Sequence, residues 1–466
     1  MTLDLSILFP VLAAATWIAV PIYAAFARGR FYAIFSAVLM TFALPGALVL
    51  HARLRAVAPD ALVVPIDLLF AYSMAAAGLQ FAHLVRARMR SSAFRWLVSV
   101  PGQTFIAGGM LSGPWLLALL PFRWLFDALD WPGALLALTF IEAIPLGLAV
   151  ASVLTSVAAQ PERVRITLSR EGPKTFGRVP VERVRGRRAA APSPPVAPPA
   201  RPAPAAASTA VASAHSAPSP ATSHASLPAP APTPRRPLRI VQLTDTHLGP
   251  WQSVARLRRR VARLMAHEPD LIALTGDYLT MESMGTPGCL VRALEPLAPY
   301  ADRCVAIFGN HDHEAPEHVR DAMAKLGIRL LIDEEACFET PAGAVQVIGS
   351  DYLGERHAER LAALLARHPR RADHLRLLLL HDPFGFHALP EDDVDLVLSG
   401  HTHGGQVGLV SLGLDWTVLS RTRWPDQGLF ARGATRLYVH RGTGFYGFPL
   451  RVGVPAEHSL LEIEGF

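Results

Sequence analysis

Long apolar stretches dominate the first third of the chain and are separated by short polar breaks. Each is close to the ~20 residues that an α-helix needs to cross the hydrocarbon core of a bilayer. No basic segment precedes the first stretch and further stretches follow it, which argues against a cleavable signal peptide. Residues 1–158 therefore predict a transmembrane domain of about five helices rather than the buried core of a helical domain. The stretches are Ile7–Phe26, Phe31–Leu50, Ala61–Leu84, Phe94–Leu120 and Pro132–Val157.

Arginines flank these stretches unevenly, and their distribution predicts an orientation. Most lie on the side that also carries the rest of the chain, whereas the opposite side has fewer arginines, with aspartates close by. The positive-inside rule then places the C-terminal part in the cytoplasm, provided that there are five spans. We therefore expect a multi-pass protein of the cell membrane. The first side has Arg28, Arg30, Arg86, Arg88, Arg90 and Arg95, and the other side has Arg53, Arg55 and Arg123.

Two acidic residues, Asp67 and Glu142, fall inside the predicted spans. A carboxylate is costly in lipid, so each is a candidate for a functional site within the membrane. The alternative is structural, because each could lie within a turn or two of an interface or pair with another helix. The sequence leaves both interpretations open.

The character of the chain changes after the last stretch. Residues 159–188 form a basic connector with a β-like run at Val164–Leu168. Residues 189–235 consist almost wholly of Ala, Pro, Ser and Thr, with no acidic residue and no Phe, Trp or Tyr. Such a segment cannot bury enough apolar surface to fold, and its prolines keep it extended. We expect it to be a disordered linker or a surface insertion.

From residue 236 onward, short β-branched or leucine-rich runs alternate with amphipathic stretches. Alternating strands and helices predict an α/β domain over residues 236–466, with functional residues in loops at the strand ends. The predicted strands include 238–243, 270–276, 304–310, 345–351, 375–382, 394–400 and 435–442, and the predicted helices are 253–269, 317–327 and 355–368.

Side chains suited to metal binding directly follow five of these strands. Taken singly, an Asp after a strand is more often a helix cap, and a His is more often an ordinary hydrogen-bonded residue. A series of such groups, each at a strand exit, instead predicts a metal centre where the strand ends meet. The groups are Asp245–His247, Gly276–Asp277, Gly309–Asp312, His381–Asp382 and Gly400–Gly404.

The chemistry of these groups indicates the kind of metal. Oxygen and imidazole ligands without thiolates suit Mn, Fe, Zn or Co, and there are more of them than one ion needs. The three cysteines, Cys289, Cys304 and Cys337, have no CxxC spacing, which argues against a thiolate zinc site or a disulfide scaffold. We therefore expect two divalent ions, a combination that can activate water and neutralise a phosphoryl group.

The motifs resemble, in this order, those of the calcineurin-like metallophosphoesterase superfamily: DTH at 245–247, GDY at 276–278, GNHD at 309–312, an isolated His and GHTHGG at 400–405. LLLLHDP, GHTHGGQV and HRGTGFYGFPLRVGVPAEHSLLEI are similar to its bacterial membrane-associated branch. The architecture is similar to that of transmembrane proteins with a metallophosphoesterase domain. For residues 236–466 the resemblance implies a four-layer α/β/β/α sandwich with two mixed sheets. Because that branch often begins with a basic strand, Val164–Leu168 could add a strand, which would make 189–235 an insertion.

The resemblance also implies roles for individual residues. His311 would contact the scissile phosphate and help the leaving oxygen depart, as an acid or a hydrogen-bond donor. Asp312 would either orient His311 or act as a structural cap. The implied ligands are Asp245, His247 and His403 for one metal, Asn310, His381 and His401 for the second, and Asp277 as the bridge between them.

The resulting hypothesis is a membrane-anchored dimetal phosphoesterase that hydrolyses phosphomono- or phosphodiester bonds through a metal-bridging hydroxide. Its location favours a lipid phosphate as substrate. GDYLTM at 276–281 lacks the second Asp and the Arg of the GDxxDRG motif of related protein phosphatases, which argues against a phosphoprotein. The alternatives are a pyrophosphate hydrolase acting on a lipid-linked nucleotide sugar, and a membrane transporter or sensor with a regulatory phosphoesterase domain. The expected partners are the bilayer and a phosphoester, without nucleic acid; the sequence sets no oligomeric state.

Overall fold

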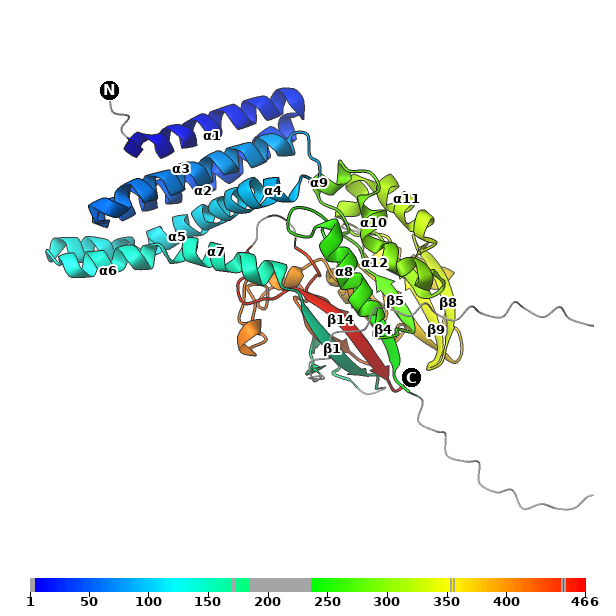
Figure 1. Ribbon diagram of the computed structural model, residues 1–466. Coiled ribbons are helices and arrows are strands. Elements are labelled where there is room, and N and C mark those ends of the chain that lie inside the picture. Colours follow the sequence, from blue (N-terminus) through cyan, green and yellow to red (C-terminus); the bar gives the residue numbers. More distant parts are fainter. Residues whose placement is uncertain are drawn as a thin grey trace, which may run out of the picture.

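The computed structural model describes residues 5–169, 172–183, 236–352, 354, 357–445, 447 and 450–466. The segment 189–235, expected to be a linker or an insertion, lies outside these residues. A bundle of long helices lies beside an α/β domain, and one end of the bundle meets that domain (Figure 1). Hydrogen bonds join the two parts, for example from the Met89 amide to Thr286 Oγ1 at 2.8 Å.

Five helical segments at the N-terminus are long and apolar enough to cross a membrane, as the sequence predicts. The fourth is longer than the expected stretch Phe94–Leu120, because the helix continues past Leu120. Its 37 residues correspond to about 55 Å, so it extends beyond the ~30 Å hydrocarbon core. The helices are α1 (Leu8–Ala27), α2 (Arg30–Val57), α3 (Asp60–Leu84), α4 (Ser92–Phe94) continued by a π-turn (Arg95–Ser99) into α5 (Val100–Ala128), and α6 (Pro132–Glu142) followed by α7 (Ile144–Val157).

The two acidic residues within the spans are buried and paired between helices. Asp67 Oδ1 lies 2.8 Å from His51 Nε2, which joins α3 to α2. Glu142 contacts Arg53 of α2 and lies 2.9 Å from Nη1 of Arg123 in α5. These contacts correspond to the structural alternative that the sequence left open, because each carboxylate is compensated by a cationic or imidazole partner.

Each of the two sheets of the α/β domain contains parallel and antiparallel strands, as the fold class predicts. The first has the strand order β3 (Glu182–Arg183), β1 (Gln160–Thr167), β14 (Glu457–Glu464), β4 (Leu238–Leu243), β5 (Leu271–Leu274), β6 (Cys304–Ala306), β7 (Arg329–Leu330). The second has the order β2 (Gly177–Arg178), β12 (Gly428–Arg432), β13 (Thr435–Val439), β11 (Leu396–Ser399), β10 (His374–Leu379), β9 (Gly343–Gly349), β8 (Glu334–Thr340).

Alternation along the strands produces four layers. In β4, Leu238 and Ile240 pack between the two sheets, whereas Val241 and Leu243 face the helices, because successive side chains of a strand point to opposite faces. The outer face of the first sheet is covered by α8 (Val254–Met265), α10 (Cys289–Leu294) and α11 (Pro316–Leu326), and that of the second by α12 (His357–Arg367).

The segment between the spans and residue 184 contributes to both sheets. Strand β1, which contains most of the β-like run Val164–Leu168, pairs in parallel with β14 over its whole length, from Gln160 opposite Glu457 to Thr167 opposite Glu464. Strand β2 pairs with β12 in the second sheet. Because α7 ends three residues before β1 begins, the last span is joined to the catalytic sheet by a very short connection.

The close approach of α2 and α5 depends on glycines at their contact. A Cβ at Gly109 would lie 2.5 Å from the Ala43 carbonyl oxygen, and one at Gly46 would lie 2.7 Å from the Gly109 oxygen. Such small residues let membrane helices pack closely. We expect Gly109→Val to destabilise the folded protein by about 1–3 kcal/mol, as overpacking does, measured by thermal unfolding in detergent.

The matched control is Gly147→Val in α7. A Cβ there would have no neighbour within 4 Å, so this variant should unfold at the same temperature as the unaltered protein. Equal unfolding temperatures for the two variants would contradict the packing of α2 against α5.

Candidate metal centre

The expected metal ligands come together where parallel strands of both sheets end. Strands β4, β5 and β6 are parallel neighbours in the first sheet, and β10 and β11 are parallel neighbours in the second. Because the carboxyl ends of parallel strands meet at one edge, their loops converge. The two sheets are joined at this edge by a hydrogen bond from Gln242 Nε2 to the Ser399 carbonyl oxygen at 3.0 Å.

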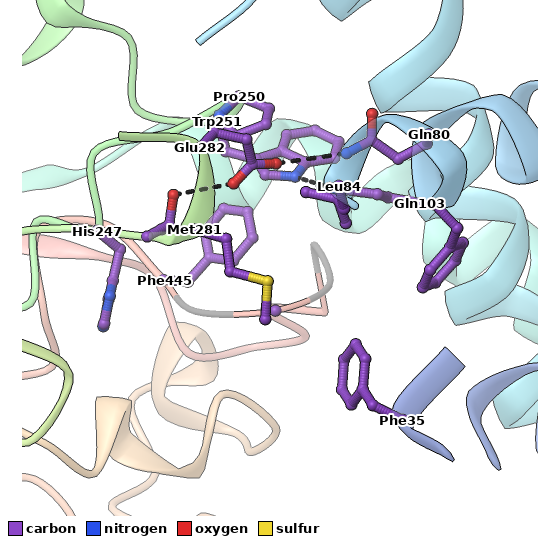
Figure 2. Close-up of a pocket in the computed structure, with 13 residues that line it drawn as sticks. Phe35, Gln80, Leu84, Gln103, His247, Pro250, Trp251, Met281, Glu282 and Phe445 are labelled. Atoms are coloured by element: carbon purple, nitrogen blue, oxygen red, sulfur yellow. Dashed lines mark hydrogen bonds between the residues drawn. The ribbon is translucent and has the colours of Figure 1, made fainter. Parts of the chain in front are cut away.

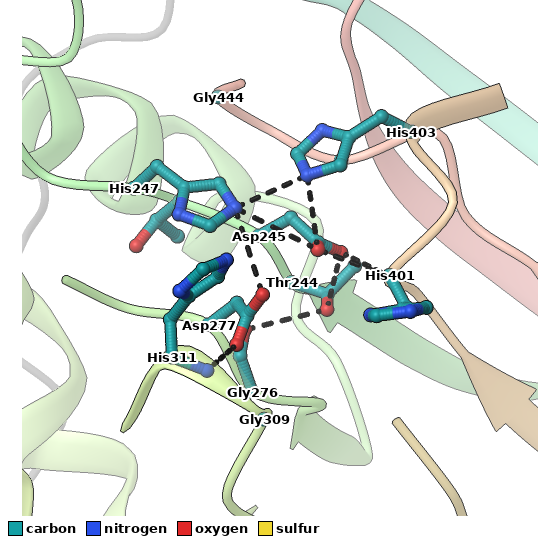
Figure 3. A network of polar contacts seen from close by, with 12 residues as sticks. Thr244, Asp245, His247, Gly276, Asp277, Gly309, His311, His401, His403 and Gly444 are labelled. Carbon is teal, nitrogen blue, oxygen red and sulfur yellow. Dashed lines mark hydrogen bonds and ion pairs between the residues drawn. The ribbon is translucent and has the colours of Figure 1, made fainter. Parts of the chain in front are cut away.

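Two groups of potential ligand atoms lie at this edge. Figure 3 shows Asp245, His247 and His403 of the first group beside Asp277 and His401 of the second. In the first, Nε2 of His403 lies 3.3 Å from Asp245 Oδ1 and 3.1 Å from Nε2 of His247. All three side chains are buried. Two imidazole nitrogens and a carboxylate oxygen that face one another in this way are the donor set of a divalent transition metal.

The second group consists of Asp277, His381 and His401, with Asn310 beside them. Nε2 of His381 lies 3.3 Å from Asp277 Oδ2. Nδ1 of His401 lies 2.8 Å from Asn310 Oδ1, so that the ring nitrogen and the amide oxygen converge. The residues expected to hold the second ion are therefore neighbours in space.

Asp277 lies between the two groups. Its Oδ2 is 3.3 Å from Nε2 of His381 in the second group and 3.7 Å from Nε2 of His247 in the first. Its Oδ1 accepts a hydrogen bond from the His311 amide at 2.9 Å. This position between two imidazoles is the one that a bridging carboxylate requires.

The hydrogen bonds of the histidines test whether these residues suit a metal. Nδ1 of His381 donates to the Thr275 carbonyl oxygen at 2.7 Å, which leaves the lone pair on Nε2 available to a ligand, as in metal-binding histidines generally. That Nε2 is buried and makes no hydrogen bond within the described ranges. Nδ1 of His247 likewise lies 3.4 Å from the Leu279 carbonyl oxygen. For these two histidines, one in each group, the hydrogen bonds fit a tautomer whose Nε2 can bind a cation.

The backbone around the ligands is strained in a way that ordinary loops avoid. Left-handed φ angles between 41° and 71° occur at several of the expected ligands. Each such conformation costs of order 1–3 kcal/mol in a residue other than glycine, and clusters of them are typical of functional sites. A Cβ at Gly309 would lie 2.2 Å from Asp277 Oδ1, so glycine is also required beside the carboxylates. The ligands with left-handed φ are Asp245, His247, Asp277, His401 and His403.

Burial and charge together set the protonation of the site. Burial would raise the pKa of Asp277, but His381 and His247 lower it well below its usual range. Burial lowers the pKa of His247 to about 3. At His381, burial also lowers the pKa, but the charges of Asp277 and Asp245 outweigh this effect and raise it to about 10. The carboxylates are thus ionised at neutral pH, and a proton on His381 competes with a cation for the same lone pair.

His311, the expected acid, lies at the edge of the site. Its ring centre is 5.7 Å from that of His247, and its Nδ1 lies 2.7 Å from Glu314 Oε1. Burial lowers the pKa of His311, but the hydrogen bond with Glu314 and the charge of Asp277 outweigh burial and raise the pKa. Glu314 was not expected from the motifs, although its position three residues after His311 could have identified it.

Asp312 makes the contacts of a structural cap, which is one of the two roles expected for it. Its carboxylate accepts hydrogen bonds from three backbone amides, at 2.7 Å from Asp277, 2.9 Å from Tyr278 and 2.8 Å from Gly309. It thereby ties the loop after β5 to the loop after β6. The neighbouring Tyr278 is fully buried, and its hydroxyl donates to the carbonyl oxygen of Ile307 at 2.8 Å.

Two further neighbours of the site were not anticipated from the sequence. Nη2 of Arg451, a fully buried residue, lies 3.0 Å from Nδ1 of His403 and donates to the Gly444 carbonyl oxygen at 2.6 Å. The ring of Trp424 stacks on His401, with centroids 5.5 Å apart. Both residues follow the last ligand motif. Arg451 lies within the family-like stretch at 440–463, but only the tertiary structure shows that these two side chains reach the ligands.

A pocket joins the metal centre to the helical bundle. Figure 2 shows Phe35, Gln80 and Gln103 on the bundle side and His247 with Phe445 on the catalytic side. The indole nitrogen of Trp251 donates to Gln103 of α5 and so closes one wall of the pocket. The lining also includes Phe81, Leu84, Pro250, Thr280, Met281, Glu282 and Gly447.

The fold and the site define a class of protein. Residues 238–405 match the sequence model of the calcineurin-like phosphoesterase family. The C-terminal domain therefore belongs to this family, and the chain is a metal-dependent hydrolase of phosphoric esters.

Individual relatives place the chain more narrowly. It is 29% identical over 232 residues to the phosphodiesterase YaeI of Escherichia coli (strain K12), which covers 49% of this chain and 82% of that protein. It is 29% identical to the uncharacterized metallophosphoesterase YkuE of Bacillus subtilis (strain 168), and the match covers 48% of this chain and 79% of that protein. It is 30% identical to the transmembrane protein with metallophosphoesterase domain of Danio rerio, and the match covers 47% of this chain and 52% of that protein. With the apolar helices, the last similarity supports membrane association.

The arrangement of ligands generates a prediction about metal content. We expect the unaltered protein to bind two Mn²⁺ ions per chain and His381→Ala to retain one, since Asp245, His247 and His403 would still hold the other. The affinity for the lost ion should fall by more than the roughly 10–100-fold that follows removal of a hydrogen-bonding partner of a ligand. Metal content is measured by plasma mass spectrometry after equilibration and desalting.

His374→Ala provides the control, because His374 begins β10 at the opposite end of the strand from His381. It should bind as much metal as the unaltered protein. Two ions bound to His381→Ala would show that His381 is not a ligand.

Proposed function

We propose that the chain is a membrane-anchored dimetal phosphoesterase that hydrolyses phosphomono- or phosphodiester bonds of a membrane lipid. The observation that carries the choice of a lipid is the pocket, which reaches from His247 to apolar residues of the spans. The related YaeI is named a phosphodiesterase. This supports a phosphodiester as the substrate, and a phosphomonoester stays an alternative.

When bound, the two divalent ions lower the pKa of a water molecule and neutralise charge on the phosphoryl oxygens. One ion would be held by Asp245, His247 and His403. The other would be held by Asn310, His381 and His401, and Asp277 would bind both ions. The left-handed backbone at five of these residues fixes the ligands before the substrate arrives, so that little reorganisation is needed during the reaction. Asp312 would act as a positioning residue, since it holds the amides of the two loops that carry Asp277 and Asn310.

His311 would supply the proton or hydrogen bond for the leaving oxygen. Glu314 accepts from Nδ1 of its ring at 2.7 Å, and Nε2 would be the atom that faces the substrate. The raised pKa keeps a larger fraction of His311 protonated at neutral pH than an ordinary histidine would have. Its half-buried position next to Asp277 places it near the expected phosphorus without making it a ligand.

A lipid fits this site because one part of the pocket is metal-binding and the other is apolar. The span-side walls of the pocket come from α2, α3 and α5, so that an alkyl chain could enter from the bilayer while the phosphate approaches His247.

The charges at the ends of the spans support a cytoplasmic catalytic domain. The arginines on the catalytic side, such as Arg86 and Arg88, follow α3 directly. On the far side, Arg53 and Arg123 are used in ion pairs with Glu142. With five membrane crossings, the positive-inside rule then places the catalytic domain in the cytoplasm of the cell.

The two alternatives differ from this proposal in ways that can be measured. A pyrophosphate bond in a lipid-linked nucleotide sugar would use the same pocket and metals, so a panel of phospholipids and nucleotide sugars separates the two substrates. A transporter or sensor would rely on Asp67 and Glu142, and both residues lie in ion pairs between helices, Asp67 with Arg55 and Glu142 with Arg53 and Arg123.

Replacement of His311 tests the chemistry. We expect His311→Ala in the full-length protein to lower kcat on p-nitrophenyl phosphate or its bis ester by about 10²–10⁴-fold, the usual contribution of a general acid. Its Mn²⁺ content should stay unchanged. Glu314→Gln should cause a smaller loss and shift the pH profile, because it weakens the hydrogen bond that raises the pKa of His311. Unaltered turnover by His311→Ala would rule out this role.

Narrowing the pocket tests the lipid substrate. Leu84→Trp should lower kcat/KM for a long-chain phospholipid at least about tenfold, since lost burial of two CH₂ groups at about 0.8 kcal/mol each is sufficient. Hydrolysis of p-nitrophenyl phosphate should not change. Leu79→Trp is the control, because Leu79 lies on the same helix and is 45% exposed. Equal lipid turnover by both variants would show that the chain of the substrate does not use the pocket.

A further inference from the structure

One segment of the catalytic domain exposes large apolar side chains to an unusual degree. Beyond the last span, the large hydrophobic residues that are exposed in the described ranges all fall between residues 409 and 424, a segment that we call the apolar loop. Leu412 is 75% exposed and Leu414 is 53% exposed. Large apolar side chains exposed together in one segment are typical of a contact with a protein or a membrane. The exposed residues are Leu409, Leu412, Leu414, Trp416, Val418 and Trp424.

The apolar loop is held in shape by its own hydrogen bonds. The Leu409 amide donates to the Trp416 carbonyl oxygen at 2.8 Å. The carboxylate of Asp426 accepts from Thr417 Oγ1 at 2.6 Å and from Ser420 Oγ at 3.0 Å. These hydrogen bonds at the base fix the conformation of the loop. In that conformation the apolar side chains point outward.

The base of the apolar loop lies next to the end of the last span. Val407 forms a β-bridge with Val452. The residue before it, Arg451, donates its amide to Ser156 Oγ at 3.3 Å and accepts from Thr155 Oγ1 at 2.5 Å. Both contacts are with the last turn of α7. Figure 1 shows this region of the chain, in orange, beside α7 on the side of the domain that carries the spans.

The composition of the loop matches a membrane interface. Tryptophan and leucine with flanking arginine are typical of segments that lie at the level of the lipid headgroups. Arg421 and Arg423 are exposed, and Asp415 is the one acidic residue between positions 409 and 424. The location beside α7 supplies such an interface, because the bilayer that surrounds the last span must end near its last turn.

We propose that the apolar loop inserts into the headgroup region of the same leaflet from which the last span emerges. The catalytic domain then has a second attachment to the bilayer, independent of the spans. The attachment bears on the site, since the loop begins soon after His403 and ends at Trp424, which stacks on His401. Insertion would thus set the height of the metal centre above the lipid surface.

The test measures lipid contact directly and does not depend on hydrolysis. Cys337 is exposed, whereas Cys289 and Cys304 are buried with raised thiol pKa values, so a thiol reagent labels a single site. Leu412→Cys with Cys337→Ser is labelled with the fluorophore NBD. The full-length protein is reconstituted in vesicles of phosphatidylethanolamine and phosphatidylglycerol, with and without doxyl-labelled lipid.

We expect blue-shifted emission from NBD at position 412 and loss of most of its fluorescence when doxyl lipid is present. Trp416→Cys in the same background should behave alike. The control is the native Cys337 on β8, an edge strand of the second sheet, which should show aqueous emission and little quenching. Aqueous emission at positions 412 and 416 would overturn the proposal. Blue-shifted emission without doxyl quenching would also overturn it, because it would mean that protein, such as a second copy of the chain, covers the loop.

Discussion

The catalytic domain is organised around two buried carboxylates, Asp245 and Asp277, that face imidazoles instead of cationic side chains. Within the described ranges neither forms an ion pair with Lys or Arg. Buried charge without compensation is strongly unfavourable, so the two carboxylates need positive charge beside them, which either a proton on His381 or a bound cation would supply. The strained backbone at both aspartates and the glycines packed against them follow from the same constraint, because the ligand atoms must converge on a small volume.

The second constraint is the short path from membrane to sheet. Because α7 is followed almost at once by β1, and β1 pairs along all of β14, the catalytic domain cannot rotate freely relative to the last span. Met89, in the loop between α3 and α4, contacts the catalytic domain, and Trp251 of that domain contacts α5. The pocket that runs from Phe35 to His247 therefore has walls of fixed relative position, which a tether alone could not provide.

Those parts of the molecule that depend on local patterns could be predicted from the sequence. Apolar runs of about 20 residues identified the spans, and alternation with motifs at strand exits identified the residues that converge around Asp277. What could not be predicted depends on tertiary contacts. Arg451 reaches His403, and Trp424 stacks on His401, only after the last third of the domain has folded around them. Phe35 and Phe445 are 410 positions apart, and no sequence period links residues that line one pocket from two domains.

The apolar loop and the pocket explain why a phosphoesterase would need an extensive membrane domain. A single helix is enough to keep an enzyme at a bilayer, but it leaves the orientation of the active site free. Here the α2, α3 and α5 walls of the pocket and the loop beside α7 constrain the domain at separate places, so the metal centre would face the lipid at a defined height. A substrate phosphate could then reach His247 while its chains remain in an apolar environment, which avoids the cost of about 0.8 kcal/mol for each CH₂ group exposed to water. The membrane helices would thereby contribute to substrate binding as well as to attachment.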